Sequence, residues 1–172
     1  EGPERKRAIA LYEEGLGIAR TIGAQDLVAR FLNNLAIQQR RAGDLRASLK
    51  MNQEARAIRR EIGDRIDMAI SLNNIGNVLL DLGDLAGATA HYDEAAGIHQ
   101  EIGYRRGLAR ARNNAADALK KQGQLARARA ANAEALTIRR DISDPGSVAI
   151  SLFHIGELLV QQGKLCHDKQ TL

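Results

Sequence analysis

Apolar residues in the middle of the chain recur at the spacing of a helical face. Positions separated by three and four residues are apolar over residues 69–82 and again over 85–102, which predicts two helices. The apolar positions are Ala69, Leu72, Ile75, Gly76, Leu79 and Leu82 in the first helix, and Leu85, Ala88, Tyr92, Ala95, Ile98 and Ile102 in the second. Gly83 lies between them, and glycine readily takes the left-handed conformation that ends a helix. The pattern therefore indicates a helical hairpin.

The same hairpin pattern returns along the chain every 40 residues without insertion. The repeated motifs are Ile-Gly at 22–23, 62–63 and 102–103, Leu-Asn-Asn at 32–34 and 72–74, and Gly-Asp-Leu at 43–45 and 83–85. A helix pair with one apolar face cannot bury that face alone, so such pairs stack into a solenoid. We expect one array over 1–172, made of a lone helix 4–22, repeats 24–63, 64–103 and 104–143, a partial repeat 144–165 and an irregular tail 166–172.

The residues of these repeats resemble the tetratricopeptide repeat (TPR) family. The motif residues are Leu72, Ile75, Gly76 and Leu79 on the first helix and Ala88, Tyr92 and Ala95 on the second. Repeats one and three depart from the motif, because Ala36 and Ala116 replace the glycine while Asn52 and Asn132 replace the aromatic residue. The period of 40 residues also exceeds the usual one, and the proline that usually ends a repeat is missing.

The 40-residue form is similar to the variant in spindle-orientation adaptors and in the sensor arrays of bacterial signal-transduction ATPases and transcriptional regulators. The resemblance implies an all-α fold, a TPR-like right-handed superhelical solenoid of antiparallel helix pairs. It also implies a scaffold or sensor that binds an extended peptide or partner segment in the groove lined by the first helices. No cofactor or metal is implied.

Composition narrows the classes of protein further. No run approaches the roughly 18 apolar residues that a membrane-spanning helix needs. The single cysteine, Cys166, excludes a disulfide framework and fits a reducing compartment, so we expect a cytoplasmic protein. The chain lacks an initiator methionine and polar caps, which suggests a piece of a longer protein that continues at least upstream. Arginine outnumbers lysine by 19 to 6, a bias that favours a bacterial regulatory protein as the parent.

Polar residues repeated on the first helices are the candidate binding residues. They form two ladders, Asn33, Asn73 and Asn113 followed by Asn34, Asn74 and Asn114. An amide both donates and accepts hydrogen bonds, so a ladder of amides can pair with the backbone of an extended peptide. In the resembling adaptors the Asn before the Leu-Gly pair and the Asn after it do this, and the latter position here holds Ile37, Asn77 and Asp117. The alternative is that these amides bond neighbouring helices.

Basic side chains on the same helices favour an acidic partner. Arg30, Arg41, Arg110 and Lys121 are the candidates for carboxylate contacts, with Arg40 and Lys120 beside them. The alternative interpretation of each is a solvated helix face. Phe153 and His154 replace the Asn pair in the last repeat, where Phe153 would anchor an apolar partner side chain or cover an array end.

Three other functions are less well supported by the residues. The four histidines form no HExxH motif and no glycine-rich loop follows a strand, so we expect no enzyme. Nucleic acid is disfavoured by the low aromatic content of 3% and the net charge of only +4. Self-association stays open as an alternative, because apolar array ends could stack tail to head.

Overall fold

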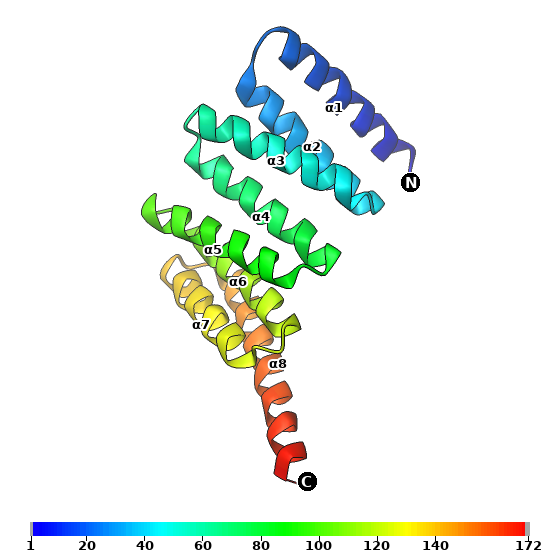
Figure 1. Ribbon diagram of the computed structural model, residues 1–172. Helices are drawn as coiled ribbons and strands as arrows, with labels where there is room; N and C mark the ends of the chain where they lie inside the picture. The colour runs from blue at the N-terminus through cyan, green and yellow to red at the C-terminus, as the bar shows by residue number, and fades with distance from the viewer. Residues whose placement is uncertain (1, 171–172) are drawn as a thin grey trace. The chain divides into compact units, whose positions relative to one another are not determined.

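The computed structural model describes the backbone of residues 2–170 and the side chains of residues 2–163 (Figure 1). Over this range the fold is all-α, with short turns between the helices, as the sequence predicts. The helices are α1 (Pro3–Thr21), α2 (Gln25–Ala42), α3 (Leu45–Glu61), α4 (Arg65–Leu82), α5 (Leu85–Glu101), α6 (Arg105–Lys121), α7 (Leu125–Asp141) and α8 (Pro145–Gln170). Helices α2, α4, α6 and α8 are the first helices of their repeats, and α3, α5 and α7 are the second helices.

The chain divides into two compact units, an N-terminal unit over 1–84 and a C-terminal unit over 85–172. The N-terminal unit holds α1 to α4 and the C-terminal unit holds α5 to α8. Within each unit, every helix packs against the next one along the chain. The boundary between the units falls inside the second predicted repeat, between its two helices.

The turns between helices follow from the repeated glycine and aspartate. Gly43 ends α2 in the left-handed conformation with φ of 87°, a value that side chains with a Cβ rarely adopt. The Asp44 carboxylate then accepts a hydrogen bond from the Ala47 amide at 2.9 Å and caps the start of α3. Ser143, which stands where the earlier repeats have glycine, also takes a positive φ of 54°.

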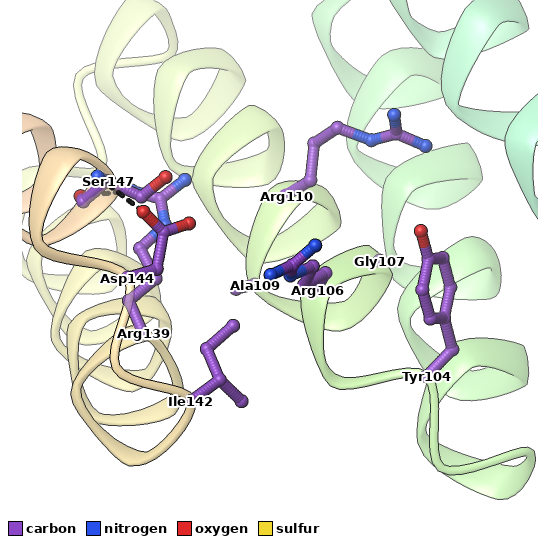
Figure 2. Close-up of a pocket in the computed structure, with 9 residues that line it drawn as sticks. All are labelled: Tyr104, Arg106, Gly107, Ala109, Arg110, Arg139, Ile142, Asp144 and Ser147. Carbon is purple, nitrogen blue, oxygen red and sulfur yellow. Dashed lines mark hydrogen bonds between the residues drawn. The ribbon is translucent and has the colours of Figure 1, made fainter.

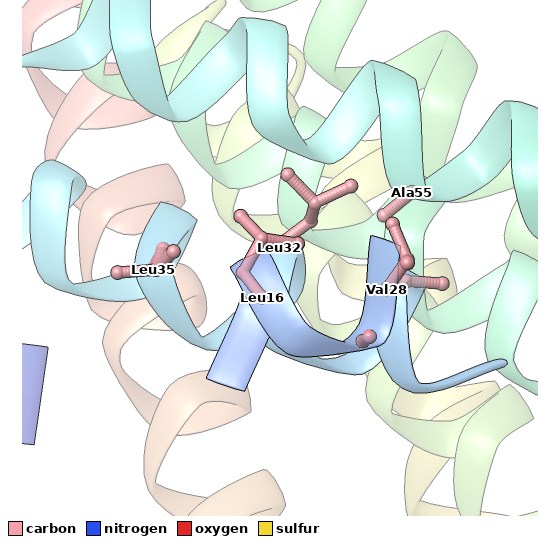
Figure 3. Close-up of a cluster of buried hydrophobic side chains, with 7 residues drawn as sticks. Leu16, Val28, Leu32, Leu35 and Ala55 are labelled. Atoms are coloured by element: carbon pink, nitrogen blue, oxygen red, sulfur yellow. The ribbon is translucent and has the colours of Figure 1, made fainter. Parts of the chain in front are cut away.

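Small and branched apolar residues fill the space between helices in both units. In the N-terminal unit, Leu16 of α1 packs with Val28, Leu32 and Leu35 of α2 and Ala55 of α3 (Figure 3). In the C-terminal unit, a cluster at other repeat positions contains Ala116, Leu119, Leu125, Ala128 and Leu158. The second-helix stripe is buried at Ala88, Tyr92 and Ala95, as predicted, whereas Leu82 at the end of the first-helix stripe is exposed.

In two of the three complete hairpins, a buried arginine near the end of the second helix forms hydrogen bonds with the first helix of the next repeat. Arg59 of α3 donates to the Ser71 hydroxyl of α4 at 2.6 Å and to the Asp67 carbonyl oxygen at 3.1 Å. Arg139 of α7, 80 residues later, repeats both bonds to Ser151 and to the Ser147 carbonyl oxygen. In the intervening repeat both partners change together, since His99 stands in place of the arginine and Ala111 in place of the serine.

The last helix differs from the sequence prediction. The pattern predicts that α8 ends near residue 162 and that an irregular tail covers 166–172, whereas the helix runs through Gly163 to Gln170; residues 171–172 lie outside the described part. Gly43, Gly83 and Gly123 all take positive φ, but Gly163 does not. The physical reason is that a glycine only permits a turn, whereas the packing of the next helix holds the turn in place. Asp168 occupies the position of the buried Ala88 and Ala128.

Candidate protein-binding groove

A pocket of about 240 Å³ lies in the N-terminal unit among α2, α3 and α4. It gathers three of the residues that the sequence predicts for partner binding, Arg41, Asn74 and Asn77, although they come from two different repeats. The pocket is lined by Ala36, Ile37, Arg40, Arg41, Ser48, Asn52, Asn74 and Asn77. Its walls therefore come from the first helices, and its remaining polar residues come from α3.

Two buried polar residues of α3 line the pocket. The Ser48 hydroxyl donates to the Ala36 carbonyl oxygen at 2.7 Å, and the Asn52 amide donates to the Ser48 carbonyl oxygen at 3.0 Å. Asn52 is 1% exposed, and its Oδ1 has no hydrogen-bond partner among the described residues. A buried acceptor without a donor costs free energy, so this atom favours a donor that enters the pocket.

Asn52 stands at a position that holds an aromatic ring in the next repeat. Forty residues later the same position holds Tyr92, whose side chain is fully buried. An amide is much smaller than a phenol ring, so replacing the aromatic residue leaves space and adds polar atoms. In the sequence, Asn52 differs from its neighbours only as a departure from the family motif. The signal that identifies it is a polar residue, repeated at Asn132, at a position where the motif has a buried aromatic ring.

The first Asn ladder makes contacts inside the protein. The Asn74 amide donates to Asn33 Oδ1 at 2.7 Å, which joins the first helices α2 and α4. Asn113 and His154 repeat this contact at 3.1 Å between α6 and α8. Asn73 is 2% exposed and donates to the Ala69 carbonyl oxygen. These bonds show that Asn33, Asn73 and Asn113 of the first ladder contact other parts of the protein. Asn34, Asn77 and Asn114 are half-buried.

The predicted basic residues are not gathered in one place. Arg41 lies on the pocket and is exposed, without an ion pair to any described residue, whereas Arg40 beside it forms a two-bond pair with Asp81 at 2.6 and 3.2 Å. Arg30 and Lys121 are exposed and do not line this pocket. Arg110 lines a different pocket in the C-terminal unit.

The corresponding first-helix surface of the C-terminal unit is more acidic and more apolar. Asp117 is half-buried, and burial raises the pKa of its carboxyl group, while His154 and Lys120 act in the opposite direction. Lys120 is already paired with Glu157 at 3.1 Å. Phe153 is 65% exposed and lines a cavity of about 540 Å³ with Leu152 and Val160.

Comparison with known sequences bears directly on these repeats. A tetratricopeptide repeat profile matches residues 67–141. This segment is similar to tetratricopeptide repeats. No curated protein matches the chain.

Solved structures extend the likeness of fold to nearly the whole chain. BtubC (BKLC) from P. vanneervenii is 22% identical with a TM-score of 0.83, over 97% of this chain and 72% of that one. A putative kinesin light chain with TPR-like repeats from Podosopora anserina is 13% identical with a TM-score of 0.76, over 96% and 82%. Aspartyl phosphate phosphatase F from Bacillus subtilis is 16% identical with a TM-score of 0.83, over 95% of this chain but only 43% of its own. The chain therefore has a TPR-like helical repeat fold.

Two other kinds of feature are missing from the described residues. No group of three or more His, Cys, Asp or Glu side chains there is placed to hold a metal ion. None of the helices in that range combines the length and the apolar character needed to cross a membrane.

Proposed function

We propose that the TPR-like repeats bind an extended, acidic peptide segment of a partner protein, with the pocket of α2, α3 and α4 as the principal contact. The observation that carries the proposal is the buried Asn52 Oδ1, which lacks a donor in a pocket bounded by Arg41, Asn74 and Asn77. An extended peptide supplies backbone N–H groups at regular intervals, so one of them can satisfy this acceptor.

Charge at the pocket selects among peptides. Arg41 is exposed at its edge without an ion pair to the described residues, while Arg40 is held by Asp81. A carboxylate of the peptide would bind the Arg41 guanidinium through charge-assisted hydrogen bonds. The side-chain amide of the neighbouring Asn74 donates one N–H group to Asn33. The Oδ1 atom of Asn74 takes no part in that hydrogen bond.

We place this activity in a cytoplasmic scaffold or sensor within a larger bacterial regulatory protein. The single cysteine and the excess of arginine over lysine support this setting. The repeats themselves would supply recognition, and catalysis would belong to other parts of such a protein.

The experiment is a selection of displayed random peptides on the purified chain, followed by affinity measurements on the enriched sequences. We expect acidic peptides whose affinity falls with added salt, because exposed ion pairs are screened. Arg41→Ala should weaken them by about twofold to fivefold, the range for an exposed ion pair. Asn52→Tyr should abolish binding, because it installs the ring that Tyr92 shows is accommodated at this position.

Arg30→Ala is the matched control, since Arg30 is an exposed arginine of α2 that does not line this pocket. Peptides that bind the Asn52→Tyr variant as well as the wild type would refute the proposed site. Failure to enrich any peptide would refute peptide binding itself.

Self-association is a second candidate, favoured by the outer face of α8. Leu152 is 48% exposed, although Leu32 and Leu72 at the same position of earlier repeats are buried. On α1, Ile18 is 56% exposed although Ile138 at its position is buried. The α1 face of one copy could cover the α8 face of another. A mass that rises with concentration in light scattering would support this, and a constant monomer mass would exclude it.

A further inference from the structure

The C-terminal unit contains a pocket that the proposed groove does not use. It has a volume of about 240 Å³ and lies between the start of α6 and the turn from α7 to α8 (Figure 2). Its lining residues are Tyr104, Arg106, Gly107, Ala109, Arg110, Arg139, Ile142, Asp144 and Ser147. This volume is below the range of pockets for drug-sized molecules, so the pocket suits a small ligand or a single chemical group.

The pocket carries three guanidinium groups and one carboxylate. Arg106 and Arg110 are exposed, and neither forms an ion pair within the described residues. In Figure 2 the Arg106 side chain occupies the middle of the view, and Arg110 extends above the hydroxyl of Tyr104. Asp144 is held by the Ser147 amide at 3.1 Å, and hydrogen bonds from Ser147 lower the pKa of its carboxyl group. Asp144 is therefore charged at neutral pH, and the net charge of the side chains that line the pocket is about +2.

Arg139 is the buried member of the three, with only 9% of its surface exposed. Its Nη1 donates to Asn113 Oδ1 at 3.1 Å, to the Ser147 carbonyl oxygen at 3.1 Å and to the Ser151 hydroxyl at 2.5 Å. All three acceptors are neutral. Burial lowers the pKa of the Arg139 guanidinium, with Asp144 opposing, yet arginine keeps its proton at neutral pH.

The equivalent arginine of the N-terminal unit shows what is missing. Arg59 Nη2 lies 3.5 Å from the carboxylate of Asp67, in addition to its bonds to neutral acceptors. The residue at the position of Asp67 in the C-terminal unit is Ser147. The C-terminal unit has thus lost the internal carboxylate of this contact, and at its edge Arg106 stands where the N-terminal unit has Asp26, while Arg110 corresponds to Arg30. Asp144 acts on Arg139 without forming an ion pair among the described residues, and a buried cation that lacks a carboxylate at ion-pair distance favours an anion from outside.

We propose that this pocket binds a phosphate group, either as the free anion or as a small phosphate monoester. A phosphate near neutral pH carries a charge of about −1.5 to −2, which is close in magnitude to the positive charge of the pocket. Its oxygens accept the several hydrogen bonds that guanidinium groups donate, and arginine favours such planar, two-bond contacts. The site is separate from the α2, α3 and α4 pocket and does not depend on peptide binding there.

The test is isothermal titration of inorganic phosphate, glycerol phosphate and acetate into the whole chain, in chloride buffer of matched ionic strength. We expect saturable binding of phosphate or its ester with one site, and at least tenfold weaker binding of acetate. Tighter binding of the ester than of inorganic phosphate would identify the ester as the preferred source. Tighter binding of acetate than of both phosphates would overturn the proposal.

Three variants locate the binding. Ser147→Asp restores the carboxylate that Asp67 supplies to Arg59, so it should abolish phosphate binding while leaving the melting temperature equal or higher. The double variant Arg106→Gln with Arg110→Gln alters only exposed side chains and should weaken binding at least tenfold with the fold intact. Arg46→Gln, an exposed arginine of the N-terminal unit, is the control and should change nothing. Undiminished binding by the double variant, or no saturable binding by the wild type, would overturn the proposal.

Discussion

Ser71→Ala tests whether the buried arginine contact between repeats stabilises the N-terminal unit. Ser71 is fully buried, and its hydroxyl accepts a hydrogen bond from Arg59 Nη1 at 2.6 Å. Alanine removes the acceptor and leaves a charged donor in a site that water does not reach. Hydrogen bonds to charged groups contribute about 1.5–3 kcal/mol, so the free energy of unfolding should fall by about that amount.

The loss should stay below that of a broken buried ion pair. Arg59 keeps the Asp67 carbonyl oxygen at 3.1 Å and the Asp67 carboxylate at 3.5 Å, so its charge is not left without a partner. Removing one member of a buried pair costs about 3–5 kcal/mol, and we expect less here. For a chain of this size the melting temperature should fall by about 3–12 °C, at about 2–4 °C for each kcal/mol.

The assay is urea denaturation followed by circular dichroism, in a double-mutant cycle with Arg59→Met. Methionine keeps an apolar chain of similar length and removes the charged donor, so Ser71→Ala should cost little in that background. The coupling between the two changes should be about 1.5 kcal/mol or more. Equal losses from Ser71→Ala in both backgrounds would show that the serine acts through packing alone and would refute the reasoning.

Two further predictions concern the C-terminal unit. A Cβ at Gly107 would lie 2.5 Å from the Tyr104 ring and 2.6 Å from the buried His99 ring, so Gly107→Ala should cost about 1–3 kcal/mol in thermal denaturation. Gly97→Ala, whose Cβ meets open space, should instead stabilise the helix by up to about 1 kcal/mol, and a similar response of both variants would contradict the packing argument. Burial, and secondarily Arg110, lowers the pKa of His99 below its ordinary value of 6.5, so the unfolded chain takes up the proton first. Stability should therefore decline as the pH falls below about 6.5, and melting curves of His99→Leu should show a smaller decline than the wild type.

The 40-residue period and the spacing of apolar residues were sufficient to predict the helices. They did not predict the contacts that depend on how each helix is rotated about its own axis. Gly43 and Gly83 mark helix ends because the left-handed conformation is a local property of the residue. That Asn74 bonds Asn33 depends on how two first helices face one another, which spacing within one helix does not determine.

The pocket residues show the same division. Arg41, Asn74 and Asn77 could be placed on first helices from the repeat alone. The open Oδ1 of Asn52 required the structure, because an amide on a second helix can be satisfied by its own backbone, as the bond from its Nδ2 to Ser48 shows. The continuation of α8 was missed for a related reason, since Gly163 alone does not require a turn.

The pairing of Arg59 with Ser71, and of Arg139 with Ser151, has a consequence for how such arrays can be rearranged. Arg59 and Ser71 both fall between the turns at 43–45 and 83–85, and Arg139 and Ser151 both follow the turn at 123–125, yet the two members of each pair belong to different 40-residue repeats. Loss of the segment between breakpoints at Gly63 and Gly103 would separate Arg59 from Ser71 and join it to Ala111. Breakpoints at Gly43, Gly83 or Gly123 would carry each matched pair along intact. The 40-residue segment whose duplication keeps each arginine with its serine is thus shifted by half a period from the helical hairpin that the sequence repeats.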